Sequence, residues 1–153
     1  MLRTRFNEAL KESMRAKEMR AVSTIRMILA ALKDRDIAAR TRGVTDGIDE
    51  AEIMSMLQGL IKQRNESAAM YEQGGRPELA EKEREEIAVI EGFLPKQMSD
   101  EEVTAAIAAI VGELGASSIK DMGRVMAELK ARHAGQMDFA KAGGLVKQSL
   151  SGK

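Results

Sequence analysis

The 153-residue chain contains no cysteine and no tryptophan, and it has only one histidine, one tyrosine and three phenylalanines. Without cysteine the chain can form neither a disulfide nor a thiolate zinc site, and it offers no thiol nucleophile. Because His133 is the sole histidine, a multi-histidine metal site is excluded, and a Ser-His-Asp triad would have to include it. The scarcity of aromatic side chains argues against stacking platforms for single-stranded nucleic acid.

Long apolar runs are also lacking. The longest, Met27 to Leu32, is far shorter than the roughly 20 residues that span a bilayer. The N-terminal stretch has no uninterrupted apolar run, as a secretory signal would, and it contains Glu8, Glu12 and Glu18, whereas transit peptides are poor in acids. We therefore expect a cytoplasmic protein with no membrane partner, no metal and no other cofactor.

Helix formers dominate what is present. Apolar residues recur at intervals of three and four along most of the chain, and no useful length alternates with the period of a strand. Capping boxes are expected at Asp49 and Ser99, each with a glutamate three residues later, and Asp138 is a further N-cap. Pro77 suits a first helical position. The expected helices cover about residues 2–14, 22–37, 49–73, 77–94, 99–112, 118–134 and 138–150.

Pro95 divides this pattern. Because the residue before a proline is disfavoured in the α region, the fourth helix should end at Phe93 or Leu94. We predict an all-α protein with an N-terminal four-helix domain, residues 1–94, and a small C-terminal three-helix domain, residues 96–153. A single seven-helix domain is the alternative. About 58 residues is near the lower limit for a domain that folds alone.

The charges of this neutral chain are unevenly distributed. Residues 1–42 contain 11 Lys/Arg and 5 Asp/Glu, a net charge of +6, whereas residues 43–95 contain 5 and 12, a net charge of −7. Residues 96–153 contain 8 Lys/Arg and 7 Asp/Glu, but the part after Gly115 alone has a net charge of +4. The first two segments can complement one another within a bundle, or the basic one can present a face to phosphates.

Three groups of motifs carry a resemblance to a known family. The first is Ser23-Thr24-Ile25-Arg26-Met27 with Ala30-Ala31-Leu32-Lys33. The second is Lys62-Gln63-Arg64-Asn65-Glu66-Ser67, Tyr71, Gly75-Arg76-Pro77-Glu78-Leu79-Ala80, Glu83 and Glu86-Ile87. The third is Phe93-Leu94-Pro95-Lys96-Gln97-Met98-Ser99, Lys120-Asp121-Met122-Gly123-Arg124-Val125-Met126 and Gly135. In this order and spacing they resemble the GatB/YqeY family over essentially the whole chain.

The resemblance implies an all-α, two-domain protein. Its C-terminal unit is similar to the tail domain of the B subunit of the glutamyl/aspartyl-tRNA amidotransferase, a tRNA-contacting appendage, and similar modules are attached to some glutaminyl-tRNA synthetases. The family label is carbon–nitrogen ligase activity with glutamine as amido-N-donor. This sequence departs from the family at Gln136-Met137-Asp138-Phe139, where a basic residue usually follows the equivalent of Gly135.

These considerations favour a tRNA-associated binding module. The candidate tRNA-binding residues are Lys120, Gly123, Arg124, Lys130, Arg132, Lys141 and Lys147. A second possibility is an adaptor that docks on an amidotransferase or an aminoacyl-tRNA synthetase. The third, an autonomous glutamine-dependent ligase, lacks support in the residues, and we assign no catalytic residue. There is no thiol and no phosphate-binding loop, and Ser117-Ser118 is interpreted as a helix start.

A cluster of polar residues falls on the predicted hairpin of the third and fourth helices. Arg64, Ser67 and Tyr71 share one helical face, because they are three and four residues apart. Arg76 and Glu83 follow on the other side of the turn. The polar cluster is either a network that clamps the two helices together or a site for a ligand or partner.

Overall fold

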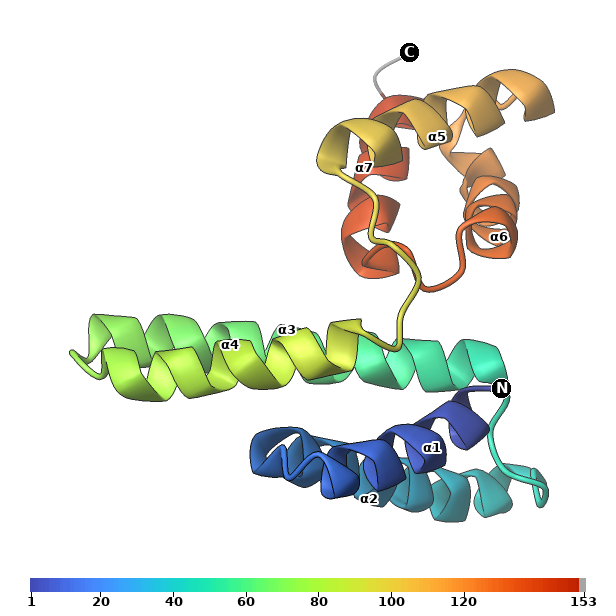
Figure 1. The fold of residues 1–153 in the computed structure, drawn as a ribbon. Coiled ribbons are helices and arrows are strands. Elements are labelled where there is room, and N and C mark those ends of the chain that lie inside the picture. The colour runs from blue at the N-terminus through green and yellow to red at the C-terminus, as the bar shows by residue number, and fades with distance from the viewer. Residues whose placement is uncertain (152–153) are drawn as a thin grey trace. The chain divides into compact units, whose positions relative to one another are not determined.

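The computed structural model describes residues 1–151, and these contain seven α-helices, two short 3-10 helices and no strand (Figure 1). The all-α prediction is therefore confirmed. The helices are α1 (Leu2–Arg15), α2 (Met19–Ala39), η1 (Arg40–Arg42), α3 (Glu50–Gln73), α4 (Pro77–Glu91), α5 (Asp100–Leu114), η2 (Ile119–Asp121), α6 (Met122–Arg132) and α7 (Phe139–Ser151).

Local sequence signals account for most helix starts. Ser99 and Glu102 form the reciprocal capping box at the start of α5, and the Asp138 carboxylate accepts from the Ala140 N–H at 2.9 Å at the start of α7. At α3, the Asp49 side chain accepts from the N–H of Glu52 at 2.9 Å. The Glu52 carboxylate bonds Arg42 instead of closing the expected box. Long-range pairing thus changes this one cap.

The end of α4 differs from the prediction. The helix ends at Glu91, two residues before Phe93. Beyond it the Phe93 N–H donates to the Ile90 carbonyl and the Leu94 N–H to the Glu91 carbonyl, so the chain tightens into three-residue turns before Pro95. The proline constrains only the residue before it, and the positions after Glu91 that were predicted to be helical form the tighter turns instead.

The chain groups into two compact units, residues 1–95 and the residues from Lys96 onward. The first unit has a core of aliphatic side chains from α1 to α4 that also includes Phe6 and Phe93. The rings of these two phenylalanines pack edge to face, with their centroids 4.8 Å apart. The second unit has a separate core in which α5, α6 and α7 contribute Ile110, Val125, Leu129 and Val146. Each core buries its own apolar stripes.

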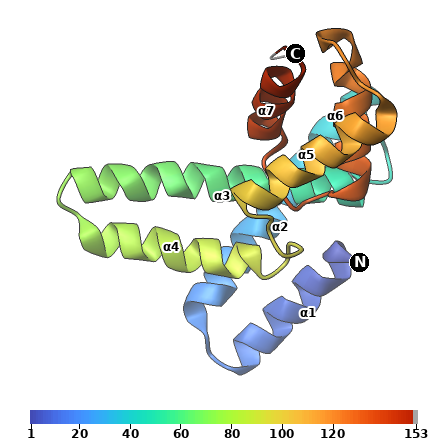
Figure 2. The same cartoon turned by 90° about the horizontal axis from the view of Figure 1, so that it is seen from above.

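In the first unit, α3 and α4 form a long antiparallel hairpin, and α1 and α2 pack against only part of its length (Figures 1 and 2). Gly75, whose φ is +72°, makes the turn between the two helices. Ala68 and Ala80 are buried in the part of the hairpin near the turn, and their small side chains let the two backbones approach closely. The turn end of the hairpin therefore extends beyond the rest of its unit.

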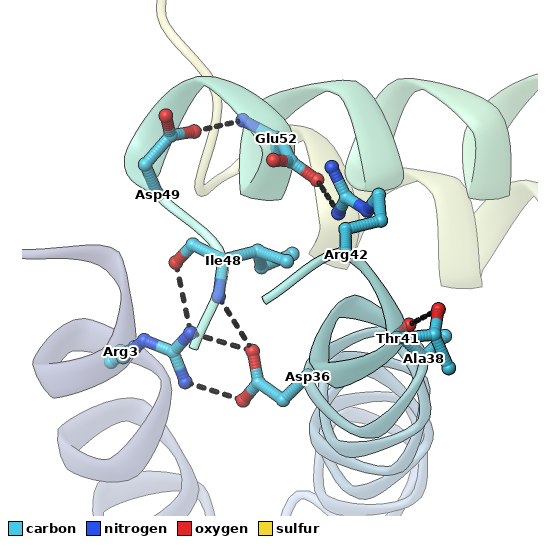
Figure 3. Close-up of polar contacts among 8 residues, drawn as sticks. All are labelled: Arg3, Asp36, Ala38, Thr41, Arg42, Ile48, Asp49 and Glu52. Atoms are coloured by element: carbon cyan, nitrogen blue, oxygen red, sulfur yellow. Dashed lines mark hydrogen bonds and ion pairs between the residues drawn. The ribbon is translucent and has the colours of Figure 1, made fainter. Parts of the chain in front are cut away.

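A network of hydrogen bonds fixes the loop between α2 and α3 (Figure 3). The Arg3 guanidinium of α1 donates to both carboxylate oxygens of Asp36 at 2.8 Å, and also to the carbonyl of Ile48 at 3.0 Å. Asp36 in turn accepts from the Ile48 N–H at 2.9 Å. We call Arg3, Asp36 and Ile48 the loop clasp.

A second contact joins α1 to the end of α4. Arg5 donates to the carbonyls of Gly92 and Phe93, at 3.0 and 3.2 Å, and its guanidinium lies 5.6 Å from the centre of the Phe93 ring. A cation suits this position because helix C-termini present carbonyls without intrahelical partners.

None of the described helices is long and apolar enough on its own to cross a membrane. The segments Asp100–Leu114 and Ile119–Arg132 together have the length and apolar composition of a membrane span, but the chain bends by 101° between them.

Candidate nucleic-acid interface and polar hairpin

The predicted tRNA-binding residues lie on η2, α6 and α7 of the second unit, and all seven are exposed. The six charged residues among them divide into those that form ion pairs and those that do not. Arg124 pairs with Asp121 at 2.9 Å, Arg132 with Glu113 and Glu128 at 2.6 and 2.7 Å, and Lys141 with Asp100 at 3.3 Å. Within residues 1–151, Lys120, Lys130 and Lys147 form no ion pair, so these three side chains are free to meet phosphates.

The ion-paired cations differ in how strongly their carboxylate partners hold them. Two carboxylates raise the pKa of Arg132 above its ordinary value, and the Arg132 guanidinium lowers the pKa of Glu113. Arg124 is held less strongly, because its partner Asp121 also accepts hydrogen bonds from the backbone N–H groups of Ser117 and Ser118. The first of these N–H groups is the main reason that the pKa of Asp121 lies below its usual range. Arg132 is thus the least available of the predicted residues.

Two of the free lysines share a local pattern. Gly123, Ala127 and Lys130 are exposed on α6 at intervals of four and three, and Ala140, Gly144 and Lys147 repeat these intervals on α7. Residues at such intervals lie on the same helical face. A Cβ atom added at Gly123 or Gly144 would meet nothing within 4 Å. Each helix therefore presents a lysine beside a low surface where another backbone can approach.

Gln136, where the sequence departs from the family, has a structural role. Its Oε1 lies 3.2 Å from Nδ1 of His133, and its backbone carbonyl accepts from the Met98 N–H at 2.9 Å. The side-chain amide of Gln97 donates to the Gly135 carbonyl at 2.7 Å. These bonds fix the α6–α7 loop to the segment before α5. Sequence reasoning missed the bonds made by Gln97 and Met98, because their partners Gly135 and Gln136 are each 38 residues away along the chain and no local spacing links them.

The polar residues of the α3–α4 hairpin are only partly brought together. Arg64 bridges the two helices, since its Nε donates to Glu86 at 2.9 Å while the two side chains are only 13% and 20% exposed. In the described part of the chain, the side chains of Ser67, Tyr71, Arg76 and Glu83 form no hydrogen bond or ion pair. The clamp therefore consists of Arg64 and Glu86, and whether the other four residues bind a partner stays a prediction.

Further ion pairs that the sequence did not reveal support the hairpin. Arg84 pairs with Glu72 across the two helices, and Arg20 of α2 pairs with Glu85 of α4. Both pairs join residues that no helical interval relates. Their side chains are about half exposed, so each contributes little to stability.

The positions considered for chemistry have structural roles in this fold. Ser118 begins a helix as expected, since it forms a capping box with Asp121, but the helix is the short η2 rather than α6 itself. His133 is the C-cap of α6. Among residues 1–151 no three histidine or carboxylate side chains gather as a metal site requires.

Comparison with known proteins supports the resemblance seen in the sequence. The family model described as "Yqey-like protein" matches residues 3–150. The chain belongs to this family. The match covers both compact units, so the family extends across Pro95.

Several curated relatives share one name, "Altered inheritance of mitochondria protein 41, mitochondrial". The protein from Kluyveromyces lactis is 33% identical over 112 residues, which are 71% of this chain and 58% of that protein. The one from Lachancea thermotolerans is 30% identical over 71% of this chain and 57% of its own length. The one from Pyrenophora tritici-repentis is 29% identical over 84% of this chain and 71% of its own length. The chain thus spans less than two thirds of the first two relatives.

These names contradict the expected cytoplasmic location, because they describe the relatives as mitochondrial proteins. The physical reason for the error is that a chain without cysteine suits any compartment that keeps thiols reduced, so composition could not distinguish between such compartments.

Proposed function

We propose that this chain is a non-catalytic binding module that associates with tRNA through its second unit. The observation that carries the proposal is the pair of exposed faces on α6 and α7, where Lys130 and Lys147 have no carboxylate partner among residues 1–151 and stand beside exposed glycine and alanine. Lysines without ion pairs can neutralise phosphates at no cost in broken salt bridges. Small neighbouring side chains let a sugar–phosphate backbone approach the helix closely.

The family resemblance supports the same proposal, because the second unit is similar to the tail of the amidotransferase B subunit, which contacts tRNA. Lys120 and Arg124 extend the basic surface at the start of α6, and Lys141 can exchange its exposed partner Asp100 for a phosphate. Arg132 contributes less, because Glu113 and Glu128 hold it. The division into a four-helix domain, residues 1–94, and a three-helix domain, residues 96–153, is part of this proposal.

The test is tRNA binding measured against salt concentration for the full chain. Each phosphate contact contributes about 0.7 to 0.9 to the negative slope of log affinity against log salt. The double variant K130Q/K147Q should lower this slope by about 1.4 to 1.8 relative to the unaltered chain. The matched control is K62Q/K82Q, which removes two exposed lysines from the hairpin. Equal slopes for the two variants, or no tRNA binding even at low salt, would refute the proposal.

A second candidate function is a protein adaptor, and the geometry of the hairpin favours it. The turn end of α3 and α4 extends beyond α1 and α2 (Figure 2), and Met70 is 71% exposed near this end. An amidotransferase or an aminoacyl-tRNA synthetase is the proposed docking partner. A defined protein that is retained by the full chain after nuclease treatment, and lost from Met70→Glu, would favour the adaptor over the tRNA module. Retention that depends on RNA would refute it.

A further inference from the structure

Three exposed cations lie at seven-residue intervals, two on α2 and the third at the start of η1 directly after it. Arg26, Lys33 and Arg40 are exposed and lie seven residues apart, so each is nearly two helical turns from the next. This interval corresponds to about 10.5 Å along the helix axis. The buried residues of the same helix, such as Ile25, Ile28 and Leu32, lie on its other side. We call Arg26, Ala30, Lys33 and Arg40 the α2 strip.

Two of the three cations of the strip, Arg26 and Lys33, are not used by ion pairs among the described residues. Asp36 pairs with Arg3 on the side of α2 that meets α1, and Arg20 pairs with Glu85 on the side that meets α4. Among residues 1–151, Arg26 and Lys33 form no ion pair, and Asp34 is the acidic residue nearest to them along the helix. Arg40 is partly engaged, because its charge helps to lower the pKa of Asp36 after the larger effect of Arg3.

We propose that the α2 strip is a binding surface for the phosphates of double-stranded RNA, separate from the lysines of α6 and α7. A row of charges on a helix is rigid, and so is the row of phosphates along an RNA duplex, which proteins recognise mainly through shape and backbone contacts. Ala30 lies between Arg26 and Lys33, so its small side chain allows close approach in this half of the strip, whereas Ile37 occupies the corresponding position between Lys33 and Arg40.

An acidic protein is the less suitable partner for this surface. Stable protein interfaces have an apolar centre with a polar rim. The strip has no such apolar centre, since its exposed apolar side chains, Ala30 and Ile37, each stand singly between two of the cations.

The inference deepens the proposed function, since both concern RNA, but it is tested on different residues. The experiment measures binding of the full chain to a blunt-ended RNA duplex as salt is raised. The R26Q/K33Q variant should lower the log–log salt slope by about 1.4 to 1.8, because it removes two phosphate contacts. Its matched control is K11Q/R15Q, which removes two exposed cations from α1 and leaves the same net charge.

Each outcome decides the matter. A lower slope for R26Q/K33Q than for K11Q/R15Q supports the strip. Equal slopes for these two variants, or a chain that does not bind the duplex at low salt, overturn it. Measuring K130Q/K147Q beside them separates the two proposals, because a loss confined to that variant leaves the proposed function standing without the strip. All the altered side chains are exposed, and circular dichroism verifies that each variant is folded.

Discussion

The charge of Asp36 should contribute measurably to the stability of the first unit. In the loop clasp, its carboxylate receives two bonds from Arg3 and one from the Ile48 N–H, and it thereby links α1, α2 and the loop before α3 (Figure 3). The substitution Asp36→Asn keeps an oxygen that can accept from Ile48 but removes the charge. It therefore isolates the electrostatic part of the clasp.

The magnitude follows from the pKa. The bonds from Arg3, aided by the Ile48 N–H, lower the pKa of Asp36 from 3.8 to about 2. A difference of this size corresponds to an upper value of about 2.5 kcal/mol in the free energy of unfolding. Because the Arg3 side chain is 39% exposed, solvent screens part of the interaction, and we expect Asp36→Asn to cost about 1 to 2 kcal/mol at neutral pH.

The pH dependence gives the sharper test. A carboxylate whose pKa is lowered by folding stabilises the folded state above its unfolded pKa, and this contribution fades as the pH falls from about 4 towards 2. Urea unfolding, followed by the fluorescence of the single tyrosine, Tyr71, reports on the first unit. The difference between the unaltered chain and Asp36→Asn should be constant from pH 7 to 5 and shrink below pH 4.

The control is Asp34→Asn, two residues earlier on the same helix, where the carboxylate is exposed and has no ion pair in the described structure. It should change stability by less than about 0.5 kcal/mol. A cost for Asp36→Asn no larger than that of the control, or a cost that persists unchanged from pH 5 to 3, would show that the clasp does not stabilise the fold through its charge.

Three further predictions concern the hairpin, α6 and catalysis. A double-mutant cycle of Arg64→Met and Glu86→Leu, measured by urea unfolding, should give a coupling of about 1 to 2 kcal/mol, because the pair is largely buried; additive single effects would contradict this. Gly123→Ala should stabilise α6 by about 0.5 to 1 kcal/mol, since nothing occupies the space of its Cβ, yet weaken tRNA binding; unchanged binding would argue against close approach there. The purified chain should release no ammonia from glutamine in an assay coupled to glutamate dehydrogenase, and steady release that survives repurification would overturn the non-catalytic proposal.

Features of this fold that depend on near neighbours were predictable from the sequence. The starts of α5 and α7 follow from Ser99 and Asp138, whose side chains cap backbone groups two or three residues later. The all-α class follows from the apolar spacing. The end of α4 was placed two or three residues too late, because the sequence shows where proline forbids a helix but not where the preceding turns tighten.

The interactions that distinguish free cations from engaged ones were not predictable in this way. The pairing of Arg132 with Glu128 follows from their i,i+4 spacing, but its second partner, Glu113 of α5, is 19 residues away along the chain and could not be read from the sequence. Likewise, Arg3 meets Asp36 and Ile48 across 33 and 45 residues. Composition shows the sign and size of the excess of basic residues, and packing decides which of these side chains are free to bind a partner.

The contact of Arg5 with Gly92 and Phe93 has a consequence for how this unit can be reused. It brings the beginning of the first unit to within hydrogen-bond distance of its end, although 87 residues separate Arg5 from Gly92. A unit whose two ends meet can be inserted into a loop of another protein, or joined to either end of one, without stretching its own core. The same closure would permit a circular permutation that joins these ends and opens the chain at the turn between α3 and α4.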